Sequence, residues 1–214
     1  MQFMDRVVLG DRLAGNIGHL QGKHAVIICL QESALLTCVT VASKIRAWVY
    51  PLLLAPVLSQ DEQPHILGAY TVDDNFYSDH AAILGISDEI WVAQQKARAV
   101  ETLSQLKAAY NMDFDPKQLA NRDIVLIADT LSETLPLVVA RQLITPLRPK
   151  SLTITIGNAT VKVAELAQTT AETVLLLDIL PINIRGTAHY FANDDTYDLK
   201  EKRTLARYIA NYWQ

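Results

Sequence analysis

The stretch Ile124-Val125-Leu126-Ile127-Ala128 is the clearest buried strand in this 214-residue sequence. An unbroken aliphatic run is typical of a strand covered on both faces, as in a parallel sheet. Polar residues 129–134 follow it, and a helix is expected over residues 136–144, because Pro136 suits a first helical turn. A strand, a polar turn and a helix in this order form the repeating unit of an α/β fold.

The same order of elements occurs nearer the N-terminus. Residues 25–30 form a second aliphatic run, residues 31–33 a polar turn, residues 34–48 a helix and residues 49–54 the next strand. A strand–helix–strand unit of this kind predicts parallel pairing with a right-handed crossover.

The rest of the chain continues the alternation. The expected elements are an amphipathic helix at 3–21, an edge strand at 66–72, a short apolar segment at 83–86, a long helix from 87–89 to Tyr110, strands at 151–156 and 173–177, a helix at 161–168 and a C-terminal helix at 199–213. No stretch rich in Pro, Gly or Ser divides the chain. We therefore expect one domain over residues 1–214, an α/β fold with a mostly parallel twisted sheet flanked by helices in three layers.

Composition and charge narrow the classes of function. Half of the residues are apolar, 20% are charged, the formal net charge is −4 and the isoelectric point is near 5.7. This balance gives no electrostatic reason to expect nucleic acid or an anionic membrane as partner. Residues 1–6 do not resemble an export signal, and no apolar run approaches the roughly 20 residues that a membrane span needs. A cytoplasmic protein is expected, with Cys29 and Cys38 as small core residues.

Ligands bind at the carboxyl ends of the strands in an open parallel sheet, so the turns after the two aliphatic strands are the candidate site. The second turn places an acid before hydroxyl-bearing residues and a helix start, whose free amides can hold an anion. The candidate residues are Leu30, Gln31, Glu32 and Ser33 in the first turn, and Asp129, Thr130, Ser132, Glu133, Thr134 and Leu135 in the second.

Each candidate residue also has a purely structural interpretation. Asp129 either caps the following turn or contacts a ligand hydroxyl, and Ser132 and Thr134 suit turn and N-cap positions as well as ligand contacts. Glu32 and Glu133 are exposed loop acids unless they converge on a cation. No metal site is expected, because no two histidines have metal-ligand spacing. The sequence also lacks a recognisable Ser-His-Asp or Cys-His pattern, which argues against a hydrolase.

Residues 124–136 resemble the defining stretch of type I phosphoribosyltransferases, in particular the stand-alone phosphoribosyltransferase-like proteins of bacteria. Three further segments support the resemblance: Phe3-x-Asp5-Arg6 at the start, Leu67-Gly68-Ala69 in the middle, and His189-Tyr190-Phe191 before the C-terminal helix. The resemblance implies a phosphoribosyltransferase-like, Rossmann-related fold and a site for phosphoribosyl pyrophosphate.

The departures from the family pattern fall on the binding residues. In the family, two acids hold the ribose hydroxyls, whereas here Ala128 replaces the first and Asp129 remains. The loop around the 5′-phosphate needs small residues, but this chain has Glu133, Leu135 and Pro136. A carboxylate about 4 Å from a phosphate charge costs on the order of 4 kcal/mol at an effective dielectric of about 20.

The loop for pyrophosphate is altered as well. The family's arginine and glycines correspond to neutral or acidic residues at positions 30–33, and residues 54–56 lack the expected base. The inherited site is therefore interpreted as degenerate.

The preferred hypothesis is a phosphoribosyltransferase-like protein that has lost ordinary catalysis and serves as a binding or regulatory module, possible ligands being phosphorylated riboses. A homodimer is expected, with interface candidates among the aromatic residues Trp48, Tyr190, Phe191, Tyr208, Tyr212 and Trp213. One alternative is an active Mg²⁺-dependent phosphoribosyltransferase with an unknown acceptor. Another is a binder or enzyme for a less anionic ligand at the same strand ends.

Overall fold

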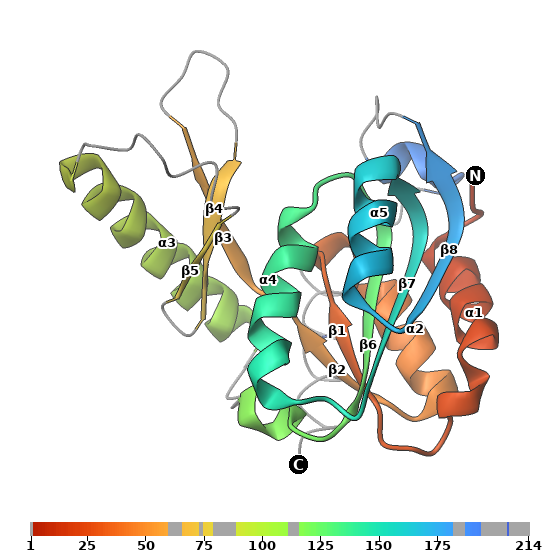
Figure 1. The fold of residues 1–214 in the computed structure, drawn as a ribbon. Helices are drawn as coiled ribbons and strands as arrows, with labels where there is room; N and C mark the ends of the chain where they lie inside the picture. Colours follow the sequence, from red (N-terminus) through yellow and green to blue (C-terminus); the bar gives the residue numbers. More distant parts are fainter. Residues whose placement is uncertain are drawn as a thin grey trace.

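A computed structural model describes residues 2–59, 66–72, 75–78, 89–110, 116–181 and 187–193, together with Leu205. Its centre is a five-stranded parallel sheet in the order β2-β1-β6-β7-β8 (Figure 1). The strands are β1 (Val26–Cys29), β2 (Trp48–Pro51), β6 (Asp123–Leu131), β7 (Ser151–Thr160) and β8 (Thr173–Leu180).

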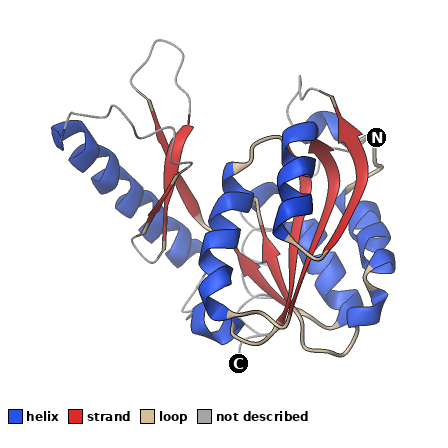
Figure 2. Cartoon of the chain, viewed as in Figure 1, coloured by secondary structure: helices blue, strands red, loops and turns tan. Residues whose placement is uncertain are grey.

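Helices cover both faces of this sheet (Figure 2). One face carries α1 (Arg6–Asn16) and α2 (Leu35–Ile45), and the other carries α4 (Leu135–Ile144) and α5 (Val161–Thr170). Each face has its own buried apolar cluster: Ile27 and Val125 point to the first, Ile28 and Leu126 to the second. The expected α/β class, a mostly parallel sheet between two helical layers, is confirmed.

The strands β6 and β7 are longer than the sequence indicated. We expected β6 to end at residue 128, but its pairing with β7 continues through Thr130↔Asn158 and Leu131↔Ala159. Asp129 and Thr130 therefore lie inside the strand rather than in the turn, and both are buried. Their polarity suggested a turn, because sequence alone does not show the partners that satisfy polar groups inside a sheet.

A second, antiparallel sheet was missed. It consists of β3 (Leu54–Leu58), β4 (Ile66–Thr71) and β5 (Phe76–Tyr77) in the order β3-β4-β5, with α3 (Glu89–Tyr110) packed along β3 and β4 (Figure 1). The strand expected at 49–54 is present as β2, parallel to β1, but its end was placed too late: the chain leaves the parallel sheet after residue 52 and begins a new strand at Leu54. The expected edge strand at 66–72 is the central strand of this second sheet.

Capping sets the helix boundaries. The Asp5 carboxylate accepts a hydrogen bond from the Val8 amide at 2.7 Å, so α1 begins at Arg6 rather than at residue 3. Arg46 adopts a left-handed conformation with φ of 57° and ends α2. The helix α3 ends at Tyr110, as expected. Short 3-10 helices occupy Gly18–Leu20, Glu32–Ala34, Pro116–Leu119, Thr145–Leu147 and Thr187–Tyr190.

The N-terminal segment lies beside residues 190–193. The Phe3 amide donates to the Tyr190 carbonyl and the Ala192 amide donates to the Phe3 carbonyl, both at 2.8 Å. Cys29 and Cys38 are free, buried thiols, as expected. Among the described helices, none has the length and apolarity to cross a membrane. The segments expected at 83–86 and 199–213 lie outside the described residues, apart from the buried Leu205.

Candidate functional site

The strand order brings the two candidate turns to one edge of the sheet. The chain runs from β1 outward to β2 on one side and from β6 outward to β7 and β8 on the other, so the direction of winding reverses between β1 and β6. These two strands are neighbours, and the Leu30 amide donates to the Ile127 carbonyl at 2.9 Å. Such a reversal point is where open α/β sheets bind their ligands.

Asp129 lies beneath this edge, inside the core. Its side chain is fully buried. One carboxylate oxygen accepts a hydrogen bond from Arg6 Nε at 2.9 Å, and the other accepts from the Thr37 hydroxyl at 2.5 Å. Arg6 belongs to the first turn of α1 and Thr37 to α2, so Asp129 joins β6 to both helices of this layer.

Burial dominates the ionisation of Asp129. Desolvation raises the pKa of Asp129 to about 6, although the hydrogen bond from Thr37 and the charge of Arg6 lower it in part. The carboxyl group thus titrates near neutrality while both of its oxygens remain engaged. Gly157 fits this close packing, because a Cβ there would lie 2.5 Å from the Asp129 carbonyl oxygen.

Arg6 brings three distant parts of the sequence together. Its guanidinium lies over the ring of Phe191 at 4.4 Å from the centroid, while Phe3 and Phe191 pair through their backbones. The segments around Phe3, Asp129 and Phe191 are therefore neighbours in the fold. Sequence reasoning did not assign a role to Arg6. Its spacing of three and seven residues from the buried Leu9 and Leu13 was the available signal that it faces the core.

The first turn holds an acid in a defined position. Glu32 opens the short helix after β1, and its carboxylate accepts a hydrogen bond from the hydroxyl of Tyr110 at 2.7 Å. Burial, followed by this bond and the charge of Glu32, raises the pKa of Tyr110, which keeps its hydroxyl protonated as the donor. Gln31 Oε1 is buried and accepts no hydrogen bond from the described residues, and Ser33 is partly buried.

The second turn, residues 132–134, leads directly from β6 into α4. Thr134 precedes α4 as its N-cap residue, yet its side chain makes no capping bond. The Thr134 carbonyl accepts from the amides of Leu137 and Val138, both at 3.0 Å, and the Thr160 hydroxyl donates to the Ser132 carbonyl at 3.1 Å. Pro136 has no amide hydrogen to offer.

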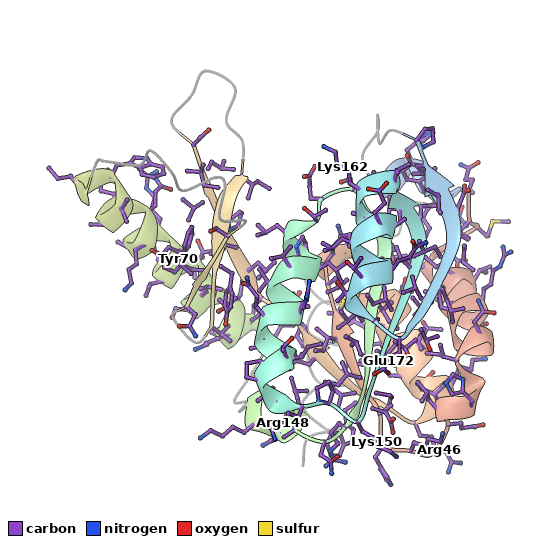
Figure 3. All side chains as sticks on the ribbon, in the orientation of Figure 1. Arg46, Tyr70, Arg148, Lys150, Lys162 and Glu172 are labelled. Carbon is purple, nitrogen blue, oxygen red and sulfur yellow. The ribbon has the colours of Figure 1, made fainter. Side chains whose placement is uncertain are left out.

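Exposed basic side chains lie at both edges of the parallel sheet. Figure 3 labels Arg46, Arg148 and Lys150, which precede β2 or β7 and so lie at the amino-terminal edge of the sheet. Of these, Lys150 contacts Asp123 at 3.6 Å. Near the candidate turns the structure places the exposed acids Glu32 and Glu133. Lys162, in the first turn of α5 directly after β7, is an exposed base at this same edge (Figure 3), so an anion there would meet side chains of both signs.

The described residues also offer little to a metal ion. Within the described ranges, no group of three or more His, Cys, Asp or Glu side chains could hold a metal. Glu32 is engaged with Tyr110, and Asp129 with Arg6 and Thr37. If Glu32 and Glu133 converged on a cation, no third acid among the described residues would be there to complete its ligands.

The protein therefore has a three-layer α/β/α fold, in which the strands of the parallel sheet are added outward in both directions from the central pair β1 and β6. No family model and no curated protein matches the sequence. Among solved structures, the protein TT1426 from Thermus thermophilus is similar over 99% of both chains, with 18% identity and a TM-score of 0.77. This chain therefore shares its fold with TT1426.

More distant matches include enzymes. A mutant of hypoxanthine phosphoribosyltransferase from Trypanosoma cruzi, complexed with the product IMP, matches at 11% identity and a TM-score of 0.46, over 92% of this chain and 84% of the enzyme. A purine phosphoribosyltransferase from Pyrococcus horikoshii matches at 12% identity and a TM-score of 0.44, over 85% of this chain and 92% of the enzyme. Likeness at these scores does not extend to the details of a site.

Proposed function

We propose that this chain is a phosphoribosyltransferase-like protein whose strand-end site has lost catalysis, and that it serves as a binding or regulatory module. The observation that supports the proposal most strongly is the position of Asp129. Both of its carboxylate oxygens are engaged inside the core, by Arg6 and by Thr37. In the family that the sequence resembles, the corresponding acid holds a ribose hydroxyl.

The energy balance opposes a return of Asp129 to ligand binding. Freeing the carboxylate would leave Arg6 buried without it, and breaking a buried ion pair costs about 3–5 kcal/mol. A single hydrogen bond to a ribose hydroxyl returns about 1.5–3 kcal/mol when one partner is charged. The neighbouring position, Ala128, offers no polar side chain to make up the difference.

Electrostatics at the turns adds to this cost. Phosphoribosyl pyrophosphate carries several negative charges, and the exposed carboxylates of Glu32 and Glu133 lie in the turns that would surround it. Tyr110 fixes the position of the Glu32 carboxylate through a 2.7 Å hydrogen bond. Mg²⁺ would offset part of this repulsion, but the lost ribose contact would remain.

Calorimetric titration of phosphoribosyl pyrophosphate with Mg²⁺ tests the proposal, with ribose 5-phosphate as a second ligand. We expect no saturable heat at millimolar ligand. Dissociation constants in the micromolar range would instead support an active Mg²⁺-dependent transferase and would contradict the proposal. The double variant Glu133→Gly/Leu135→Gly is the control: if repulsion and bulk in the second turn were the whole obstacle, it would bind ribose 5-phosphate.

A homodimer is part of the proposal. Two of the aromatic interface candidates are engaged within the chain, since Phe191 is buried against Arg6 and the ring of Trp48 lies 4.6 Å from the Arg122 guanidinium. Of the remaining candidates, the structure describes Tyr190, which is partly exposed. Light scattering at micromolar protein should give about twice the chain mass of 23.8 kDa, and a monomer would contradict this part.

A further inference from the structure

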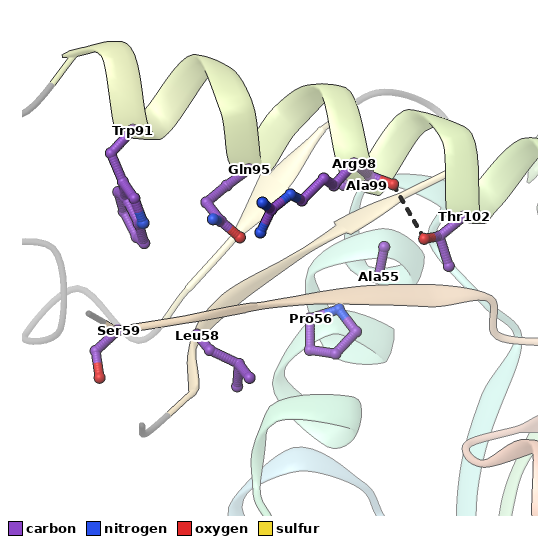
Figure 4. A pocket seen from close by; sticks show the side chains of 9 residues that line it. All are labelled: Ala55, Pro56, Leu58, Ser59, Trp91, Gln95, Arg98, Ala99 and Thr102. Atoms are coloured by element: carbon purple, nitrogen blue, oxygen red, sulfur yellow. Dashed lines mark hydrogen bonds between the residues drawn. The ribbon is translucent and has the colours of Figure 1, made fainter. Parts of the chain in front are cut away.

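A hollow lies away from the strand-end site, between the edge strand β3 and the helix α3. It has a volume of about 580 Å³, within the range of small-molecule sites (Figure 4). The helix contributes Trp91, Gln95, Arg98, Ala99 and Thr102, and the strand with its following residue contributes Ala55, Pro56, Leu58 and Ser59.

The helical period explains how the hollow is lined. Trp91, Gln95, Arg98 and Thr102 are spaced by four, three and four residues, so they share one face of α3. Ala55 and Ala99 are buried at the contact between strand and helix. Their small side chains leave space beside the larger groups, which extend from α3 toward β3 (Figure 4).

The polar groups of this hollow favour a singly charged anion. Among the nine described residues that line it, Arg98 carries the charge and none is acidic. No carboxylate of the described residues pairs with Arg98, and the Gln95 amide has no hydrogen-bond partner among them. The Thr102 hydroxyl already donates to the Arg98 carbonyl at 3.0 Å, which leaves it as an acceptor.

The apolar groups favour a planar ring. Trp91 offers an aromatic face, and Pro56 and Leu58 supply apolar surface on the strand side. An edge strand such as β3 could pair with an extended peptide, but Pro56 removes an amide donor from it. An extended peptide is therefore a poorer occupant. From this combination we infer that the hollow binds an aromatic monoanion, with its ring beside Trp91 and its carboxylate or sulfonate on Arg98 and Gln95.

The test uses 8-anilinonaphthalene-1-sulfonate as an aromatic monoanion and N-phenyl-1-naphthylamine as its uncharged counterpart. Fluorescence titration of the full chain should show saturable binding of one probe per chain, tighter for the sulfonate. Arg98→Gln should weaken sulfonate binding by about tenfold, because a charge-assisted hydrogen bond is lost, and should leave the uncharged probe unaffected. Arg141→Gln, an exposed arginine on α4, is the matched control and should change neither affinity.

The inference is overturned if the two arginine variants behave alike, if the wild-type chain binds both probes equally, or if it shows no saturable binding. Arg98 is exposed, so its variant should unfold at the same denaturant concentration as the wild-type chain. Titration with phosphoribosyl pyrophosphate should give the same result in Arg98→Gln and wild type, because the two sites share no residue.

Discussion

The buried pair formed by Arg6 and Asp129 makes a direct prediction at the scale of single residues. Arg6→Met leaves the Asp129 carboxylate in the core without its cation, so the free energy of unfolding near pH 7.5 should fall by about 3–5 kcal/mol. Adding Asp129→Leu should recover most of this loss, because the uncompensated charge is then gone. Urea denaturation of the single and double variants measures both effects.

A surface ion pair serves as the matched control for Arg6. Lys44 lies 3.3 Å from Asp11, and the side chains of both residues are about half exposed. Lys44→Met should change the free energy of unfolding by less than about 1 kcal/mol, since exposed pairs contribute little. If Arg6→Met cost no more than Lys44→Met, the buried pair would have no role in holding α1 to β6.

The ionisation of Asp129 predicts a particular pH dependence. Its pKa is about 6 in the folded chain and 3.8 in the reference state, so the folded chain binds this proton more tightly than the unfolded chain. The stability that the proton provides is complete below about pH 4 and is lost as the pH rises through 6, by about 3 kcal/mol in total. The difference in stability between wild type and Asp129→Asn, measured from pH 4 to 7, should follow this direction, and a difference independent of pH would contradict it.

The sequence indicated Asp129 as the residue of interest but not its partners. The position of Asp129 directly after an aliphatic run is local information, which the sequence contains. The partner Arg6 lies 123 positions away and meets it only because α1 packs over β7, the strand next to β6. A pairing over this distance leaves no pattern in the local sequence. The one local sign is that Arg6 is a charged residue on the buried side of an amphipathic helix.

At the scale of elements, the contact between α1 and α2 depends on Gly10. A Cβ at this position would lie 2.7 Å from Thr40 Cβ and 3.0 Å from the Thr37 carbonyl oxygen. Gly10→Ala should therefore lower the free energy of unfolding by about 1–3 kcal/mol through overpacking. Urea denaturation provides the measurement.

Gly15 offers a control within the same helix. No atom lies within 4 Å of a Cβ built there. Gly15→Ala should raise the free energy of unfolding by about 0.5–1 kcal/mol, because alanine loses less backbone entropy in a helix. Equal effects of the two substitutions would mean that helix propensity, rather than the approach to Thr40, governs both positions.

The elements themselves were predictable where one physical signal dominates. Aliphatic runs gave β1 and β6, and the helix α4 starts within one residue of the position that Pro136 indicated. The second sheet was missed because β3 follows β2 after two residues, and the continuous apolar sequence conceals the change of sheet. Apolar content indicates burial but does not show which of two sheets a strand joins.

At the scale of the whole molecule, the second sheet and α3 are attached to the parallel sheet beside the candidate site. One buried apolar cluster extends from Ile27 and Val125 in the parallel sheet to Ala99 and Leu103 on α3. A polar contact supplements it, because Tyr110 at the end of α3 donates to Glu32 in the turn after β1. The two sheets are therefore coupled at the edge where a ligand would bind.

The coupling between the sheets can be tested at Tyr110. Tyr110→Phe keeps the buried ring but removes the donor to Glu32, so the free energy of unfolding should fall by about 1–3 kcal/mol and amide exchange at the C-terminal end of α3 should become faster. Tyr70→Phe is the matched control, since the Tyr70 hydroxyl has no hydrogen-bond partner among the described residues. The control should leave both measurements nearly unchanged. If Tyr110→Phe also left exchange in α3 unchanged, the apolar cluster alone would hold the two sheets together, and the bond to Glu32 would contribute nothing to their coupling.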